Sequence, residues 1–221
     1  MSQVTYLDVK ESKEIQTYIR MADQSLSALG FTEHAFPHVT KCANTAYHLL
    51  LDLGYPARTA ELARIAGYTH DIGNVINRID HAQSGAVMAF RILDKMGMDA
   101  SEVATVISAI GNHDEGTAVP VNPVAAALIL ADKSDVRRSR VRNKKVSSFD
   151  IHDRVNYSVQ ESQLVLSKEK HTVTLYLTID TEICAVMEYF EIFMERMLLC
   201  RKAADFLKLH FGLVVNGQAL L

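Results

Sequence analysis

Helical spacing of apolar residues over positions 12–136 is the sequence feature that most constrains the fold. Apolar side chains recur every three or four residues in six successive segments, which glycine or proline separates. The expected helices cover approximately residues 15–29, 37–53, 59–70, 81–96, 101–110 and 122–136. Ser101 can cap the fifth helix, and Pro37 and Pro123 suit helix starts. The pattern predicts a helical bundle, because each apolar stripe needs a neighbour to bury it.

The pattern changes after residue 150. Segments 163–166 and 172–179 are rich in Val, Leu, Thr and Tyr, with a charged stretch at 167–170 between them, which predicts a β-hairpin. Thr181 and Glu182 begin a long predicted helix that ends near Leu209, and the segment from Phe211 onward predicts one more short strand. We therefore expect a mainly α protein, with a helical domain over residues 1–150 and a hairpin and long helix over 151–221 packed on the same body.

Composition excludes several classes of protein. The 221 residues suit one large domain with a modest appendage, and the 48% hydrophobic and 22% charged content is that of a globular chain. A formal charge of −3 argues against a surface built for nucleic acid. No apolar run is long enough for a membrane span, and the 3 cysteines form no CxxC pair. We expect a cytoplasmic protein without a disulfide framework or a thiolate zinc site.

The adjacent pair His70-Asp71 lies at the end of a predicted helix and is followed by Ile72-Gly73. Neighbouring side chains on a helix diverge by about 100°, so the two can meet at one ion only where the helix ends. Gly73 would permit the backbone to unwind there. A single His-Asp dipeptide is common in proteins without metal, and it needs further ligands before it indicates a site.

Further histidines and an aspartate supply such ligands. His38 lies in the first turn of its predicted helix, His81 at a helix start, His113 just past a helix end and Asp132 within the sixth helix. A bundle could direct all of them inward. Imidazole nitrogens together with carboxylate oxygens suit iron, manganese, zinc or cobalt better than magnesium or calcium.

The series His38, His70-Asp71, Asp132 resembles the motif of the HD-domain superfamily, which is named for its His-Asp pair. The resemblance covers roughly residues 31–140 and includes Ala131-Asp132-Lys133. It implies an HD-type helical bundle and a metal-dependent phosphohydrolase, in which these four side chains ligate one divalent transition metal ion.

The resemblance also leaves the number of ions open at one or two. His81 and His113 match the extra histidines of binuclear members, where the residue equivalent to Asp71 bridges both ions. Some binuclear phosphohydrolases carry two adjacent histidines where this chain has Asn112-His113. The resulting set of six ligands is similar in number to that of the di-iron oxygenases of the superfamily.

A divalent ion lowers the pKa of bound water towards neutrality and neutralises phosphoryl oxygens. We expect Asp71 or Asp114 to take up the proton in catalysis. Cations are dense after Asp132, which indicates either anion capture or a solvated helix end; they are Lys133, Arg137, Arg138, Arg140, Arg142, Lys144 and Lys145.

Lys133 and Arg137, one turn apart on an extended sixth helix, are the favoured substrate-binding residues, together with Arg78 near His70-Asp71. His34 lies four residues before His38 and is either an outer-shell or substrate-binding group, or a surface or capping histidine.

The sequence therefore predicts hydrolysis of a nucleotide or another phosphomonoester or phosphodiester by metal-activated water. The alternatives are a di-iron oxygenase and a non-enzymatic module that retains metal. The expected partner is a small anionic, phosphorylated molecule rather than a membrane or a nucleic acid, and the long C-terminal helix leaves a homodimer open.

Overall fold

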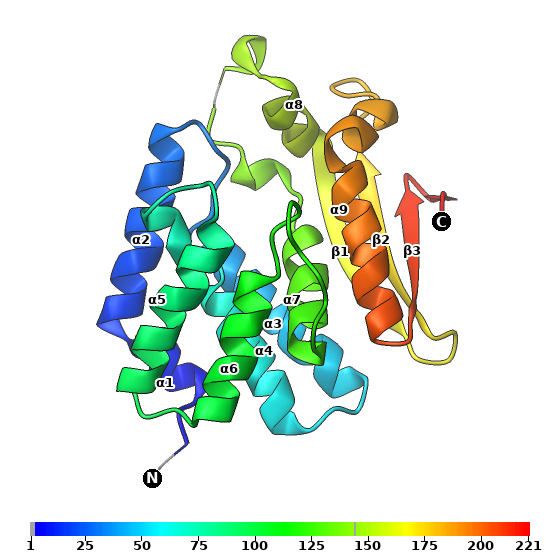
Figure 1. Cartoon of the computed structure of the whole chain (residues 1–221). Coiled ribbons are helices and arrows are strands. Elements are labelled where there is room, and N and C mark those ends of the chain that lie inside the picture. Colours follow the sequence, from blue (N-terminus) through cyan, green and yellow to red (C-terminus); the bar gives the residue numbers. More distant parts are fainter. Residues whose placement is uncertain (1–2, 144) are drawn as a thin grey trace.

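The computed structural model describes residues 3–143 and 145–221, so Lys144 of the basic stretch lies outside the described part. The N-terminal part is a helical bundle, which confirms the predicted fold class (Figure 1). Its helices are α1 (Tyr6–Glu11), α2 (Lys13–Ala28), α3 (Phe36–Asp52), α4 (Ala57–Thr69), α5 (His81–Lys95), α6 (Ala100–Gly111) and α7 (Pro123–Lys133). A short 3-10 helix, η1 (Ile72–Val75), follows α4, and the apolar spacing predicted neither η1 nor α1.

Helix α7 is the centre of the bundle. Every residue from Val124 to Ala131 is buried, and the helix packs against α3, α4, α6 and α9 (Val186–Phe206). A helix that is apolar on all sides needs neighbours on all sides. Because α7 presents Asp132 in its last turn, this packing fixes the position of that carboxylate.

Two predicted helix boundaries in the bundle differ from the structure. Helix α7 ends at Lys133 rather than near Val136, and the Asp135 N–H already donates to Asp132 O instead of Ala131 O. Side chains bind the next two carbonyls: Ser162 Oγ donates to Ser134 O at 2.6 Å, and Arg140 Nη1 to Asp135 O at 2.7 Å. The N-cap of α6 is Asp99 rather than Ser101. The Asp99 carboxylate accepts from the Ser101 backbone N–H at 2.8 Å, and Ser101 lies inside the helix.

The C-terminal part contains a small sheet and the long helix. It consists of α8 (Ile151–Ser158), β1 (Val159–Ser167), β2 (Thr172–Ile179), α9, β3 (His210–Val215) and β4 (Gln218–Ala219). The hairpin of β1 and β2 is confirmed, and the sheet order is β1-β2-β3-β4. Strand β3 pairs in parallel with β2, so α9 is the crossover that such a connection requires.

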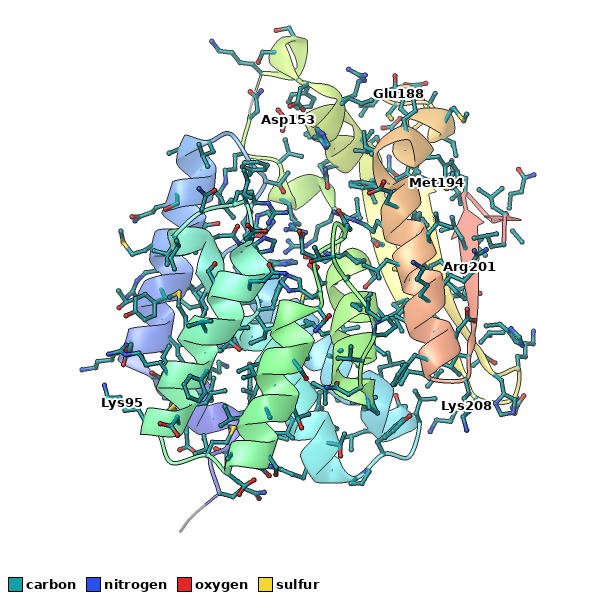
Figure 2. The ribbon with its side chains drawn as sticks, in the orientation of Figure 1. Lys95, Asp153, Glu188, Met194, Arg201 and Lys208 are labelled. Carbon is teal, nitrogen blue, oxygen red and sulfur yellow. The ribbon has the colours of Figure 1, made fainter. Side chains whose placement is uncertain are left out.

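Helix α9 joins the sheet to the bundle. It starts at Val186 rather than Thr181, because the backbone N–H groups of Ile183 and Cys184 donate to Asp180 O in a turn. It packs against α7, β2 and β3, while Met194 and Arg201 are exposed (Figure 2). Within the described part of the chain, no helix combines the length and apolar character needed to cross a bilayer.

Candidate metal centre

Four of the predicted ligands converge at the ends of three helices. His38 lies in the first turn of α3, His70 caps the C-terminus of α4, Asp71 precedes η1, and Asp132 is in the last turn of α7. His38 Nε2 is 3.5 Å from Asp71 Oδ2 and 3.3 Å from Asp132 Oδ1. His70 Nε2 is 3.2 Å and 3.6 Å from the same two oxygens. These four side chains therefore face a common point.

His81 and His113 complete a second group on the other side of Asp71. Their Nε2 atoms are 3.2 Å apart, and His81 Nε2 is 3.5 Å from Asp71 Oδ1. The His113 ring also packs edge-on against that of His70, with centroids 4.9 Å apart. The two oxygens of Asp71 thus face different histidines, Oδ2 towards His38 and His70 and Oδ1 towards His81.

The second ring nitrogen of each histidine is held by a hydrogen-bond acceptor. The Nδ1 contacts are His38 to Asp135 Oδ2 (2.8 Å), His70 to Gly67 O (2.9 Å), His81 to Arg78 O (3.0 Å) and His113 to Ile110 O (2.6 Å). Carbonyls and ionised carboxylates only accept, so each Nδ1 carries the proton in the neutral ring. Each Nε2 is then left with a lone pair directed at the centre, as in metal-ligating histidines.

Two buried polar atoms of the centre have no hydrogen-bond partner among the described residues, namely His70 Nε2 and Asp71 Oδ2. Leaving a buried polar group unpaired costs about 1–3 kcal/mol. Both atoms are acceptors in the neutral histidine and ionised aspartate, so a cation satisfies both at once. The residues present therefore fit a divalent metal ion held by nitrogen and oxygen donors.

The two carboxylates of the centre change the pKa values of the neighbouring histidines. Burial opposes the charged form of His70, but the Asp71 and Asp132 carboxylates outweigh it and raise the pKa of His70 to about 10. Burial and the positive charge of His70 lower the pKa of His113 well below its usual value. The two carboxylates thus favour a proton on His70 when no cation neutralises them, and a metal ion competes with that proton for the same site.

Asp135 supports the centre and was missed by the sequence analysis. It is fully buried, accepts from His38, and pairs with Lys41 Nζ at 2.8 Å and Arg137 Nε at 2.9 Å. Its place one turn after Asp132 was the available signal. Arg137 also pairs with Glu33 and does not line the cavity described below, so the predicted shared face of Lys133 and Arg137 is wrong.

Gly73 is required by a close contact rather than by unusual backbone angles. A Cβ atom at this position would lie 2.0 Å from His81 O and 2.5 Å from Gly85 N, and its φ is not positive. The sequence analysis explained Gly73 by unwinding of the backbone, whereas the structure explains it by this close contact. The glycine lets α5 approach η1, which brings His81 to Asp71.

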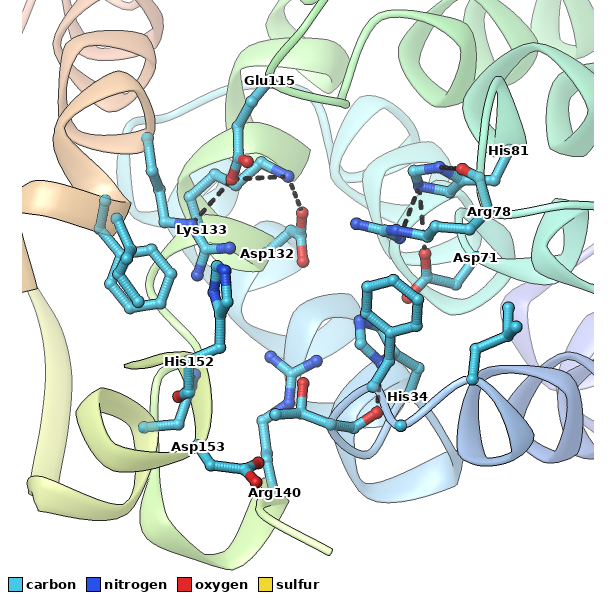
Figure 3. Close-up of a pocket in the computed structure, with 18 of the residues that line it drawn as sticks. His34, Asp71, Arg78, His81, Glu115, Asp132, Lys133, Arg140, His152 and Asp153 are labelled. Atoms are coloured by element: carbon cyan, nitrogen blue, oxygen red, sulfur yellow. Dashed lines mark hydrogen bonds and ion pairs between the residues drawn. The ribbon is translucent and has the colours of Figure 1, made fainter. Parts of the chain in front are cut away.

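A cavity of about 340 Å³ opens over the ligands (Figure 3). Asp71, His81, His113 and Asp132 form part of its wall, and four cationic side chains also line it: Arg78, Lys133, Arg140 and Arg196. His34 lies just before α3 rather than on its face, and it lines the cavity too. Side chains from α8 and α9 close the cavity, so the C-terminal part contributes to the site.

The cationic side chains differ in how they are paired. Lys133 Nζ is 2.6 Å from Asp132 Oδ2, whereas the Arg140 guanidinium is taken up by the backbone carbonyls of Glu33 and Asp135. Arg78 has only long contacts, 3.4 Å to Asn74 Oδ1 and to His81 Nε2 and 4.0 Å to Asp114. Arg78 is therefore the cation of the predicted set best placed to take an anion.

Asp114 and Cys42 lie at the edge of the site. Asp114 Oδ1 is 4.0 Å from His81 Nε2, but the side chain does not line the cavity. Cys42 Sγ is 3.7 Å from both ring nitrogens of His38, close enough to join a cluster with His38, His70 and Asp132. The sequence analysis missed this proximity, although Cys42 is one helical turn after His38.

Comparison with known proteins agrees with this geometry. The chain matches the model of the HD domain over residues 36–148, just over half of its length. It is also 24% identical over 188 residues to "Uncharacterized protein MJ1020" of Methanocaldococcus jannaschii, a match that covers 75% of this chain and 72% of the relative. The matched segment includes His38, His70-Asp71 and Asp132 at the buried cluster, and the chain belongs to the HD domain family.

Proposed function

We propose that this protein is a metal-dependent phosphohydrolase that acts on a small phosphorylated substrate. The observation that carries the proposal is the unpaired pair of buried acceptors, His70 Nε2 and Asp71 Oδ2, beneath a cavity that Arg78 and Lys133 line. Cationic side chains next to a metal centre suit a phosphoryl group, which needs its negative charge neutralised.

The ligand groups divide between two ions. His38, His70, Asp71 and Asp132 would hold one ion, and His81 and His113 would hold a second that Asp71 shares. When bound, such ions lower the pKa of water and neutralise phosphoryl oxygens.

The remaining side chains act on the substrate and the proton. Arg78 binds the phosphoryl oxygens, since its guanidinium has no short contact to give up. Lys133 holds Asp132 in place and offsets its charge. The proton goes to Asp71, which lines the cavity, or to Asp114, which lies at its edge with 32% of its side chain exposed.

A phosphate-release assay tests the proposal. The metal-free protein is loaded with Mn²⁺, Fe²⁺, Co²⁺ or Zn²⁺ and given two classes of substrate. Release of inorganic phosphate is measured for nucleotides and sugar phosphates, and release of the alcohol is measured for phosphodiesters, because a diester leaves a monoester on hydrolysis. We expect release with at least one metal, and none from Asp132→Ala or from chelated protein. The absence of release with all four metals would contradict the proposal.

A di-iron oxygenase is the second candidate, and the ligand count favours it. Asn112 Nδ2 donates to Ser108 O at 2.8 Å inside α6, so this side chain is engaged in its own helix and the set stays at six. Oxygen consumption by the Fe²⁺-loaded protein, without phosphate release from any substrate, would support this candidate.

A further inference from the structure

Arg196 of α9 reaches the cavity from outside the segment that matches the HD domain. Its Nε donates to Glu115 Oε1 at 2.8 Å, and its guanidinium lies over the Phe193 ring, 4.1 Å from the centroid. The side chain is 19% exposed and lines the cavity. The guanidinium of Arg196 is therefore held in one orientation, by Glu115 at its Nε edge and by Phe193 on one face.

The other edge of this guanidinium is open. The Nη1 and Nη2 groups of Arg196 donate no hydrogen bond to any residue that the structure describes. Arg140, in the same cavity, uses its Nε and Nη1 groups on backbone carbonyls. A largely buried guanidinium that is oriented by one carboxylate and open to a cavity is a pre-organised anion-binding group.

Arg196 belongs to the same chain of charges as the metal ligands. Glu115 Oε1, which orients Arg196, is 3.6 Å from Lys133 Nζ, and Lys133 Nζ is 2.6 Å from Asp132 Oδ2. Figure 3 shows Glu115 and Lys133 across the cavity from Arg78. Arg196, held on the Glu115 side, and Arg78 thus approach the space over the centre from two directions.

We propose that Arg196 binds the terminal phosphate of the substrate opposite Arg78, and that the protein therefore prefers phosphomonoesters to phosphodiesters. The inference rests on the proposed function. A monoester phosphate carries a charge near −2 at pH 7, whereas a diester carries −1, so a second guanidinium favours the monoester. Planar guanidinium groups also pair with two phosphate oxygens at once.

Binding of inorganic phosphate to the metal-loaded protein tests this assignment without turnover. Titration calorimetry and thermal shift compare the wild type with Arg196→Gln, and with Arg201→Gln as the exposed control on the same helix. Dimethyl phosphate serves as the monoanionic probe. We expect the dissociation constant for phosphate to rise roughly 10-fold or more in Arg196→Gln, at unchanged metal content, because charge-assisted hydrogen bonds to the phosphate are lost. Arg201→Gln should match the wild type.

The following results distinguish phosphate binding by Arg196 from a purely structural role of Arg196 in anchoring α9. Dimethyl phosphate should bind more weakly than phosphate to the wild type, and the difference should shrink in Arg196→Gln. If Arg196→Gln melts earlier but keeps its affinity for phosphate, Arg196 only anchors α9 and the assignment is wrong. Arg196→Lys, which keeps the charge, covers the case in which Arg196→Gln does not fold, and it should show intermediate affinity. A wild type that binds no phosphate with any of the four metals would instead contradict the proposed function.

Discussion

The imidazole of His38 donates from Nδ1 to Asp135 Oδ2 across 2.8 Å, while its Nε2 faces the metal centre. The buried carboxylate thereby fixes both the tautomer and the orientation of the ring. Replacement of Asp135 by Asn should lower metal affinity about 10–100-fold, the usual effect of losing such a partner. The metal content that remains after dialysis against increasing concentrations of a chelator measures this loss of affinity. Asp52→Asn, on the surface beside Lys168, is the control and should keep wild-type affinity.

The division of ligands around Asp71 predicts how many ions each variant holds. We expect two ions per chain in the wild type, one in His113→Ala and none in Asp71→Ala, because Asp71 faces both groups of histidines. Elemental analysis of the purified variants gives the ratios. His48→Ala, on the exposed side of α3, should retain both ions. Full metal content in Asp71→Ala would show that the ligand assignment is incorrect.

The raised pKa of His70 makes the metal-free protein sensitive to alkaline pH. Between pH 6.5 and about 10, folded protein holds a proton on His70 that the unfolded chain has lost, so the free energy of unfolding falls as pH rises. Metal affinity should rise over the same range, because the proton must leave first. Melting temperatures of chelated protein at pH 6.5 and 9 test the first effect. His70→Gln should show a smaller decline, and an equal decline in both proteins would rule out His70 as its source.

The contact at Gly73 predicts a local packing defect. In Gly73→Ala the new Cβ meets backbone atoms of α5, so we expect a loss of at least roughly 1–3 kcal/mol of stability and reduced metal content as His81 shifts. Gly116→Ala is the matched control, since a Cβ there meets nothing within 4 Å. Urea unfolding of both variants measures the difference, and similar stabilities would argue against a tight approach of α5 to η1.

Arg78 and Arg137 were both predicted to bind substrate, and their surroundings now separate them. Arg78→Gln should raise KM by roughly 10–100-fold, the equivalent of about 1.5–3 kcal/mol for hydrogen bonds to a charged group. Arg137→Gln should leave KM unchanged and lower the melting temperature, because Arg137 pairs with the buried Asp135. Steady-state kinetics with the best substrate measure KM for both variants. A large increase of KM in Arg137→Gln would contradict the conclusion that Arg137 lies outside the substrate site.

The helices and the ligand set were predictable because they depend on local signals. Apolar spacing and helix-breaking residues are properties of a few neighbouring positions, and they located α2 to α7 within a few residues. The candidate ligands His38, His70, Asp71 and Asp132 were recognisable because together they resemble the motif of the HD-domain superfamily, and the structure brings them to one buried cluster.

What the sequence did not indicate depends on contacts between distant segments. The parallel pairing of β2 with β3, the salt link of Arg196 to Glu115 and the packing that opens the cavity each join positions far apart in the chain. The end of α7 also involves distant segments, since Ser162 of β1 and Arg140 bind the carbonyls of Ser134 and Asp135. Because α7 ends at Lys133, Arg137 lies outside the helix and off the face on which it was expected.

The order of the chain has a consequence for how the site assembles during synthesis. All six proposed ligands lie between His38 and Asp132, while α9, which closes the cavity, comes later. Translation proceeds at about 5–20 residues per second, so the ligand-bearing helices leave the ribosome seconds before Arg196 does. Because α7, which carries Asp132, also packs against α9, the ligand-bearing helices reach their final packing only when the last long helix of the chain has been made.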